Sequence, residues 1–183
     1  MKTVDAIKGS DQIAVVGHML NKHGGDTYRD IWQLGINLAL RISDLLNLTY
    51  SDFAGGNTIT VIEGKTGKTR IIKLNDKVQT IVKQRQSLNP NDNYLFQSVG
   101  NRAKSLLKPI THETVARKFA EVGEIIGVHL GTHSMRKTRG YAMWSAGVAH
   151  FGVIRPPVSV WSGHLFRYGP ATRFGIIQPP MTV

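Results

Sequence analysis

The 183-residue sequence contains no cysteine, which excludes a disulfide framework and any metal site built on thiolates. Long apolar runs are missing as well. No uninterrupted stretch is long enough to span a bilayer, and the N-terminus lacks the apolar core of a secretory signal. We therefore expect a soluble, cytoplasmic protein that has no membrane partner. A hydrophobic content of 41% is enough to build the core of one compact domain.

Acidic residues are scarce: 12 Asp and Glu stand against 23 Lys and Arg, which gives a net charge of +11. Such an excess points to nucleic acid, because binding releases the counterions of the phosphates. A merely soluble basic protein is the alternative that charge alone leaves open. The cationic residues are dispersed along the chain, which favours a folded binding surface over a disordered arm. A metal nuclease is disfavoured because no carboxylate cluster accompanies the histidines.

Apolar residues at helical spacing predict most of the secondary structure. Helices are expected over residues 11–22, from Asp26 onward, over a short segment that carries Ile42, Leu45, Leu46 and Leu48, and over residues 76–85, 111–126 and 134–145. The glycines after His23 end the first helix, and Asp26 or Thr27 caps the second. Thr111, with Thr114 one turn later, is a plausible start for the fifth.

The period changes to two in residues 58–62 and 69–73, which are rich in β-branched side chains. The glycine-broken segment between them is predicted to be a hairpin loop. Helices around one small antiparallel sheet, the hairpin near 57–74, make the expected fold α+β and mainly α-helical. Residues 148–183 hold several Pro and Gly residues, so we expect irregular structure there.

Two short patterns in the first half of the chain could carry chemistry. Arg41 stands at the junction of two apolar helical segments, in LRISDLLNL. A surface arginine paired with Asp44, three residues on, is the alternative interpretation. The hairpin tip, GKTGK, carries Lys65 and Lys68. These lysines could reach a phosphate or donate a proton, although charged turn residues are usually just solvated.

A third pattern is GTHSMRKTR at residues 131–139. His133 and Arg136 are three residues apart at a predicted helix start, so both project from one face toward one ligand. The N–H groups of a helix N-terminus suit a phosphate. A His-x-x-Arg pair nevertheless occurs often by chance.

The order and spacing of these patterns are far more specific than any one of them. LALRISDLLNLTYSDF resembles the first arginine box of the tyrosine recombinase (phage integrase) family, NTITVIEGKTGKTRIIKLN its lysine hairpin, and GTHSMRKTRGYAMWSAG its second box. The resemblance covers residues 26–147. It implies an integrase-type catalytic domain over residues 1–183, without the separate N-terminal domain of the family and with an irregular tail over 148–183.

The resemblance implies a recombinase of a phage or other mobile element that breaks and rejoins DNA and needs no cofactor. Two arginines grip the scissile phosphate, a tyrosine attacks the phosphorus, and a 3′-phosphotyrosyl link conserves the energy of the cut bond. The implied partners are double-stranded DNA at attachment or recombination sites and further copies of the chain, as a tetramer on DNA.

Roles are carried over position by position. Arg41 and Arg136 correspond to the phosphate clamp, Lys65 to the general acid with Lys68 as a second candidate, and His133 to a proton-transfer or hydrogen-bonding group. Asp44 is expected to brace the site rather than react. The residues expected to contact DNA are Lys68, Arg70, Lys137, Arg139 and Arg173.

The match weakens toward the C-terminus. His164, in a Gly-His pair, corresponds to a second phosphate-binding histidine, although it comes several residues late and follows a Pro-Pro pair. A surface loop histidine is the alternative. Phe174 stands where the family has its nucleophilic tyrosine, and phenylalanine has no hydroxyl, so we expect DNA binding without cleavage. Tyr168 is the nearest hydroxyl, although it comes too early.

Two explanations stay open for Phe174: a Tyr→Phe change introduced to trap uncleaved DNA, or a tail that has diverged. The leading hypothesis is therefore a recombinase catalytic domain that is deficient in cleavage. The alternative is a non-catalytic, sequence-specific DNA-binding module derived from one. A basic nucleic-acid binder with chance motifs is a third.

Overall fold

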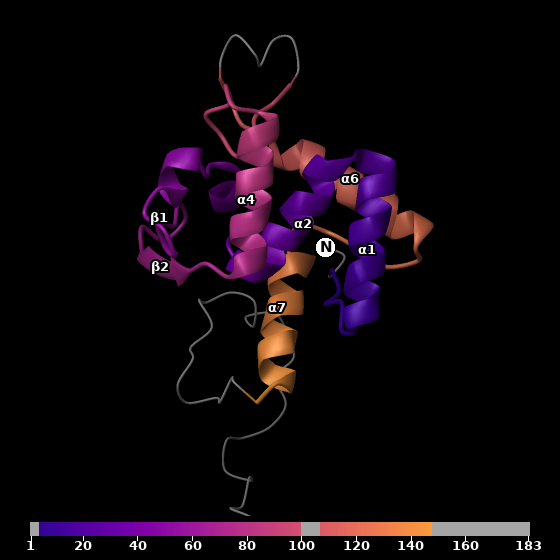
Figure 1. Ribbon diagram of the computed structural model, residues 1–183. Helices are drawn as coiled ribbons and strands as arrows, with labels where there is room; N and C mark the ends of the chain where they lie inside the picture. Colours follow the sequence, from indigo (N-terminus) through magenta and orange to yellow (C-terminus); the bar gives the residue numbers. More distant parts are fainter. Residues whose placement is uncertain (1–3, 100–106, 148–183) are drawn as a thin grey trace, which may run out of the picture.

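The computed structural model describes residues 4–99 and 107–147, which form helices around one β-hairpin (Figure 1). The elements follow one another as α1 (Ser10–Gly24), α2 (Asp26–Leu38), α3 (Ile42–Leu46), the 3-10 helix η1 (Tyr50–Phe53), β1 (Thr58–Ile62), β2 (Thr69–Lys73), α4 (Asp76–Leu88), α6 (His112–Ile125) and α7 (Ser134–Ser145). This arrangement confirms the prediction of a mainly α-helical α+β fold. The irregular structure expected over 148–183 lies outside the described residues.

The hairpin has the predicted bounds. Its strands are antiparallel, with Thr58 opposite Lys73 and Ile62 opposite Thr69. Ile59 and Val61 are buried while the threonine between them is exposed. This alternation is the period-two pattern of a strand with one face on the core. The inner face of the hairpin is therefore fixed by the sequence.

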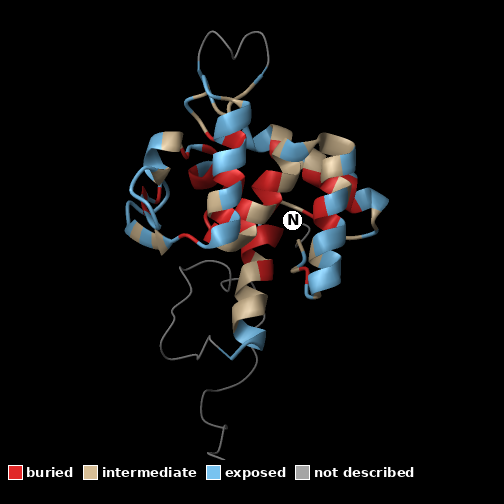
Figure 2. Cartoon of the chain, viewed as in Figure 1, coloured by how far each residue is buried: buried red, intermediate tan, exposed pale blue. Residues whose placement is uncertain are grey.

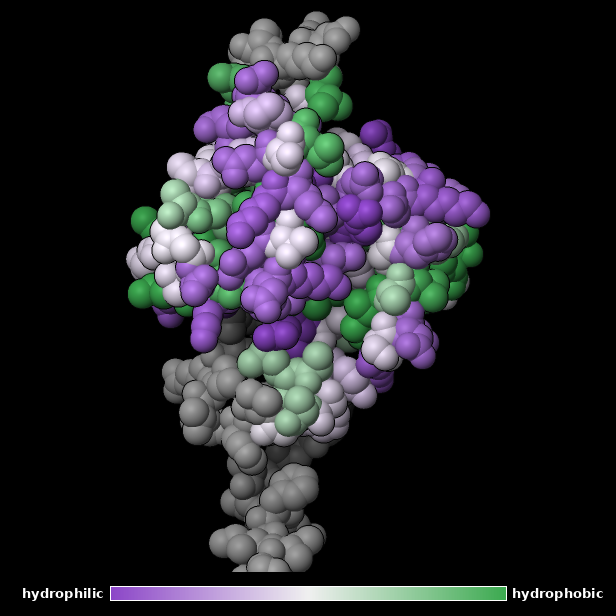
Figure 3. Space-filling view, in the orientation of Figure 1, coloured by the Kyte–Doolittle hydropathy of each residue, from purple (hydrophilic) through white to green (hydrophobic). Residues whose placement is uncertain are grey.

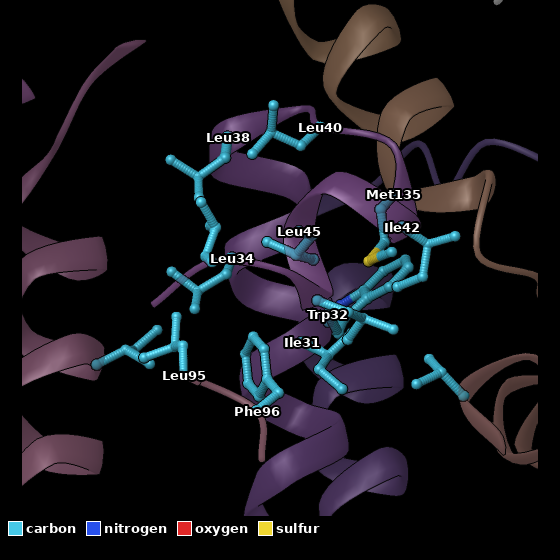
Figure 4. Close-up of a cluster of buried hydrophobic side chains, with 14 of the residues drawn as sticks. Ile31, Trp32, Leu34, Leu38, Leu40, Ile42, Leu45, Leu95, Phe96 and Met135 are labelled. Carbon is cyan, nitrogen blue, oxygen red and sulfur yellow. The ribbon is translucent and has the colours of Figure 1, made fainter. Parts of the chain in front are cut away.

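Helix α2 is the central element, and it contacts α1, α3, α4 and α7. Figure 2 shows buried residues concentrated along it. Ile31, Leu34 and Leu38, which were predicted to share one face, are all buried. Trp32 is fully buried, its ring edge meets Phe119 of α6, and its indole N–H donates to a carbonyl of α1. One side chain thus ties three helices together, at the centre of the cluster in Figure 4.

A buried ion pair joins α2 to α4. Arg85 Nη1 lies 3.0 Å from Asp30 Oδ2, and both side chains are at most 10% exposed. The same guanidinium donates to the Leu95 carbonyl and lies over the Phe96 ring. Because each charged group has partners, the desolvation of the pair is offset. This contact holds the segment after α4 against the centre of the domain.

Three local details differ from the expectations. Helix α2 begins at Asp26, and its capping position is Gly25, so the predicted capping by Asp26 or Thr27 is wrong. Gly25 has a φ of 84°, a conformation that favours glycine, and the chain therefore turns from α1 into α2 without a side-chain cap. Leu48 is buried but lies beyond the end of α3. The short helix η1 was not predicted.

Helix α6 begins as expected, because the Thr111 side chain accepts a hydrogen bond from the Thr114 N–H. At its other end the chain folds back against it. A Cβ on Gly123 would lie 2.6 Å from the carbonyl oxygen of Val128 and 2.9 Å from Cβ of Leu130. The absence of a side chain at Gly123 therefore allows the close return of the segment that leads into α7.

The face seen in Figure 3 is largely hydrophilic over α4. Of the helices in the described ranges, none is long and apolar enough to cross a membrane.

We expect Gly123→Ala to destabilise the domain by about 1–3 kcal/mol, the usual cost of overpacking, because the obstructing atoms belong to the backbone. The matched control is Gly140→Ala in α7, where an added Cβ meets no described atom within 4 Å. That change should stabilise by about 0.5–1 kcal/mol through helix propensity. Urea unfolding followed by circular dichroism measures both, and equal effects would refute the packing argument.

Candidate active site

Arg41 lies in the short link between α2 and α3. Ala39 adopts a left-handed conformation with a φ of 50° at the end of α2, and Arg41 is the extended N-cap residue of α3. Its neighbours Leu40 and Ile42 are both buried. Because they anchor the link on either side, the Arg41 side chain is held close to the surface of the core and is only 14% exposed.

The nearest carboxylate to Arg41 is Glu63, which follows β1. Arg41 Nη1 lies 2.8 Å from Glu63 Oε2, whereas its distance to Asp44 Oδ2 is 3.9 Å. The pair with Asp44 in the alternative interpretation is therefore present, but it is the longer of two ion pairs, and Arg41 is not a surface residue. The arginine is mostly buried, and its shortest ion pair reaches a residue 22 positions away along the chain.

Glu63 continues the inward-facing positions of β1, and its side chain is only 3% exposed. Besides Arg41, its carboxylate accepts hydrogen bonds from the Thr66 hydroxyl at 2.8 Å and from Arg70 Nη1 at 3.4 Å. Burial by itself raises the pKa of Glu63. The hydrogen bonds from Arg41, Thr66 and Arg70 and the charge of Arg41 outweigh it and lower the pKa to about 2. Glu63 is therefore an anion at neutral pH.

The hairpin turn carries Lys65 and Lys68, and both are exposed. At its base, the Gly64 N–H donates to Asp44 Oδ1 at 3.1 Å, and the Glu63 N–H donates to the Lys68 carbonyl at 3.0 Å. Asp44 thus contacts the hairpin as well as Arg41, a geometry that agrees with the bracing role expected for it. Both lysines lie in a turn whose base is attached to the Arg41 junction.

Arg136 lies in the first turn of α7 and is buried. Its neighbour Met135 packs into the core, where it contacts Gly35 of α2 (Figure 4). Burial lowers the pKa of Arg136, the charge of Arg41 lowers it further, and the carboxylate of Glu63 raises it. The guanidinium stays protonated at neutral pH. The effect of Arg41 on the pKa of Arg136 indicates that these two arginines, 95 positions apart in the sequence, lie near each other in the fold.

His133 is the N-cap residue of α7 and is exposed. Its pKa is lowered first by partial burial and then by the positive charges of Arg136, His112, Lys137 and Arg41. The imidazole is therefore mostly neutral at pH 7 and can exchange a proton or hydrogen-bond an oxygen. His112, at the start of α6, also lies close to this loop, because its Nε2 is 3.4 Å from Thr132 Oγ1.

The segment before α1 fastens α7 from the other side. The Ile7 N–H donates to Thr138 Oγ1 at 2.9 Å, and Lys137 Nζ donates to the Val4 carbonyl at 2.7 Å. Lys137, expected to contact DNA, thus also has a structural contact in this conformation. Arg139, on the same helix, is partly exposed.

His164, Tyr168, Arg173 and Phe174 lie outside the described residues. Within the described part of the chain, Arg41, His133 and Arg136 come together beside the lysine hairpin. No group of three or more His, Asp or Glu side chains in those ranges is arranged to hold a metal ion. The charges that are gathered there suit an oxyanion such as a phosphodiester.

The model of the phage integrase family matches residues 11–153. The chain belongs to the phage integrase family. A probable integrase/recombinase of Bacillus subtilis (strain 168), YoeC, is 36% identical over 144 residues, which cover 77% of this chain and 75% of that protein. The resemblance to the tyrosine recombinases that the sequence motifs indicated is therefore confirmed at the level of the family.

Solved structures show the same fold. The lambda integrase catalytic core matches with a TM-score of 0.63 at 15% identity, over 79% of this chain and 85% of that one. XerA recombinase matches with a TM-score of 0.60 at 22% identity, over 79% of this chain and 53% of that one. A lambda integrase dimer bound to a COC′ core site matches over 80% of this chain but only 43% of that one. This integrase chain therefore spans about half the length of the latter two.

One residue of the candidate site could not be identified from the sequence patterns considered, and another has an unexpected contact. Glu63, the closest partner of Arg41, was read only as part of a loop. Yet Ile59, Val61 and Glu63 are two apart, and this period places Glu63 on the inner face. Arg70 was expected to contact DNA, and it lies on the inner side of β2, where it bonds Glu63. Extending the two-residue period of β1 by one step, and applying the same period to β2, would have placed both Glu63 and Arg70 on the inner face.

The pKa of Glu63 predicts a pH dependence of stability. A carboxyl whose folded-state pKa lies near 2, below its ordinary 4.5, stabilises the fold fully above the ordinary value and loses that contribution as the pH falls toward 2. The free-energy difference between the wild type and Glu63→Gln should thus be about 3 kcal/mol near pH 7. It should shrink between about pH 4.5 and about pH 2.

Urea unfolding at a series of pH values tests this expectation. Glu124→Gln, which changes an exposed carboxylate of α6, is the control and should differ little from the wild type at any pH. A Glu63→Gln difference that stays constant down to about pH 2 would contradict the assigned pKa.

Proposed function

We propose that this chain is the catalytic domain of a site-specific DNA recombinase, in which Arg41, Arg136, His133 and Lys65 act on one scissile phosphodiester. The observation that carries the proposal is the meeting of Arg41 and Arg136 across the fold, with His133 at the start of the same helix as Arg136. Family membership supports the reaction class, and the resemblance of the three sequence boxes to those of the tyrosine recombinases supports the roles proposed for these residues.

The two arginines would stabilise the transition state. Attack on the phosphorus produces a pentavalent phosphorane with additional negative charge on its non-bridging oxygens. Guanidinium forks match those oxygens in a bidentate manner, and they act strongly at a site with little water. Both side chains are mostly buried and held by packed neighbours. Little reorganisation is then needed when the charge develops.

Protons would be handled by the hairpin and by α7. Lys65 would donate a proton to the departing 5′ oxygen, with Lys68 as the second candidate, and both are exposed on the turn beside Arg41. His133 is mostly neutral at pH 7, so it can accept a proton or hydrogen-bond a phosphate oxygen. His164 would supply a further hydrogen bond to the phosphate. No cofactor enters this scheme, because the covalent intermediate conserves the bond energy.

Phe174 determines whether the chain can cut. A tyrosine at this position would form the 3′-phosphotyrosyl bond while the 5′ hydroxyl departs. Phenylalanine lacks the attacking oxygen, so we propose that this chain binds its DNA site and leaves it intact. The same residue favours a second candidate function, a non-catalytic DNA-binding module derived from a recombinase.

We propose double-stranded DNA as the ligand, bound by a tetramer of this chain. Lys68, Arg70, Lys137, Arg139 and Arg173 would contact its backbone. Support comes from the net charge of +11 and from fold relatives. These relatives include a lambda integrase tetramer bound to a Holliday junction, matched over 78% of this chain with a TM-score of 0.60.

A nicked suicide substrate tests the nucleophile. The chain as it stands should give no covalent protein–DNA band in a denaturing gel, and Phe174→Tyr should give one. Phe174→Leu is the matched control and should remain inert. A covalent adduct at Tyr168 in the unaltered chain would overturn the assignment. DNA binding by an inert Phe174→Tyr variant would favour the non-catalytic module.

Single changes of Arg41 or Arg136 to Ala in the Phe174→Tyr background test the clamp. Each should reduce the rate of adduct formation by about 10²–10³-fold, as loss of one oxyanion-stabilising donor does. Each should also reduce the salt slope of DNA binding by about one, because one phosphate contact is lost. Arg117→Ala in α6, which removes an equal charge from an exposed position, should leave the cleavage rate nearly unchanged. Equal losses in all three variants would refute the clamp.

A further inference from the structure

The turn that carries Lys65 is attached to the Arg41 junction by two carboxylates. Glu63 Oε2 accepts a hydrogen bond from Arg41 Nη1 and another from the Thr66 hydroxyl, each at 2.8 Å. Asp44 Oδ1 accepts the Gly64 N–H at 3.1 Å. The two neighbours of Lys65, Gly64 and Thr66, are therefore both hydrogen-bonded to these carboxylates. A turn with two glycines would otherwise be free to move.

We propose that Glu63 is a positioning residue that locks the lysine hairpin to Arg41, so that the proton donor and the phosphate clamp move as one unit. This inference rests on the proposed function, because it gives Glu63 a role through Lys65 and Arg41. No chemical step is assigned to Glu63 itself.

Two donors from different segments share one oxygen of Glu63. Because Arg41 and Thr66 bond the same carboxylate oxygen, neither can shift far without weakening the other's contact. Both carboxylates also reach Arg41 through one nitrogen, Nη1. A phosphate can therefore take the Nε–Nη2 edge of the guanidinium while the pair with Glu63 persists. The lock is compatible with substrate binding.

The burial of Glu63 makes the lock specific for a carboxylate. The side chain is 3% exposed, and Arg41 and Arg70 both direct nitrogens toward it. Replacement by glutamine keeps the shape but removes the charge, so the two guanidiniums would lose a charge-assisted partner. Aspartate keeps the charge but is one methylene shorter, and its carboxylate would contact fewer of the three donors.

Limited trypsin digestion tests the lock without any DNA chemistry. Cleavage after Lys65 and Lys68 requires local opening of the turn, and in Glu63→Gln it should rise by about ten-fold over the wild type. Glu63→Asp should give an intermediate increase and Glu124→Gln none. Glu63→Gln also lowers global stability, so Gly123→Ala, which destabilises the domain without contacting the hairpin, is the control for global unfolding. An unchanged rate at the hairpin, or a rise in Gly123→Ala as large as that in Glu63→Gln, would overturn the proposal.

Cleavage kinetics test the catalytic consequence in the Phe174→Tyr background. Glu63→Gln should slow the formation of the covalent adduct by about ten-fold or more, the scale of a defect in general acid catalysis, while DNA affinity is nearly unchanged. The same variant is then assayed on a substrate whose leaving 5′ oxygen is replaced by sulfur. The tyrosine O–P bond forms while His133 takes the hydroxyl proton, the P–S bond breaks, and the thiolate leaves with the electron pair. It needs no proton because the pKa of a thiol is about 8.5.

The sulfur substrate separates the possible outcomes. Recovery of Glu63→Gln and of Lys65→Ala to the rate of their Phe174→Tyr parent supports positioning of the proton donor. A slow Glu63→Gln that sulfur does not rescue means that Glu63 serves Arg41 alone, and the hairpin part of the proposal fails. An unslowed Glu63→Gln overturns the proposal entirely. If the parent itself forms no adduct, the proposed catalytic function fails, and the trypsin result decides the role of Glu63.

Discussion

The buried ion pair between Glu63 and Arg41 is the constraint on which the site depends. A carboxylate that is 3% exposed is strongly disfavoured unless donors replace the water that it has lost. Arg41, Thr66 and Arg70 supply them from three different segments. Burying this carboxylate without its donors would cost free energy. The hairpin therefore packs against the link between α2 and α3, where Arg41 supplies one of them. The same contacts set the position of Arg41.

Helix α2 connects the position of Arg41 to that of Arg136 on α7. Its C-terminal end leads into the link that carries Arg41, and its last turn packs on α7 where Gly35 meets Met135. Arg136 follows Met135 directly, so one rigid helix determines the relative positions of both arginines. Trp32 and Asp30 then fasten α2 to α1, α6 and α4. Interior side chains therefore determine the relative positions of Arg41 and Arg136.

The sequence predicted the regular elements well because each has a clear hydrophobic period. The hairpin strands and α7 have the predicted bounds. Glu63 was missed because a charged residue after a strand is normally assigned to the loop, and its burial depends on Arg41, far away in the sequence. The pair of Arg41 with Asp44, which was the alternative interpretation, follows from their spacing of three and is present at 3.9 Å. The shorter pair with Glu63 spans 22 positions, and local spacing gives no signal for it. The main partner of Arg41 and the burial of Glu63 are therefore set by an ion pair between distant segments, which local sequence patterns do not reveal.

The charges of the site indicate why it suits a phosphate. Arg41 lowers the pKa of Arg136, and both lower the pKa of His133, so like charges are held together at a cost. Glu63 and Asp44 act in the opposite direction on Arg136. Their two negative charges do not balance Arg41, Arg70 and Arg136 together. A phosphodiester brings one negative charge, and the transition state of its cleavage brings more. In the proposed function, this cationic group would be more complementary to the transition state than to the bound substrate, which is the difference that accelerates a reaction.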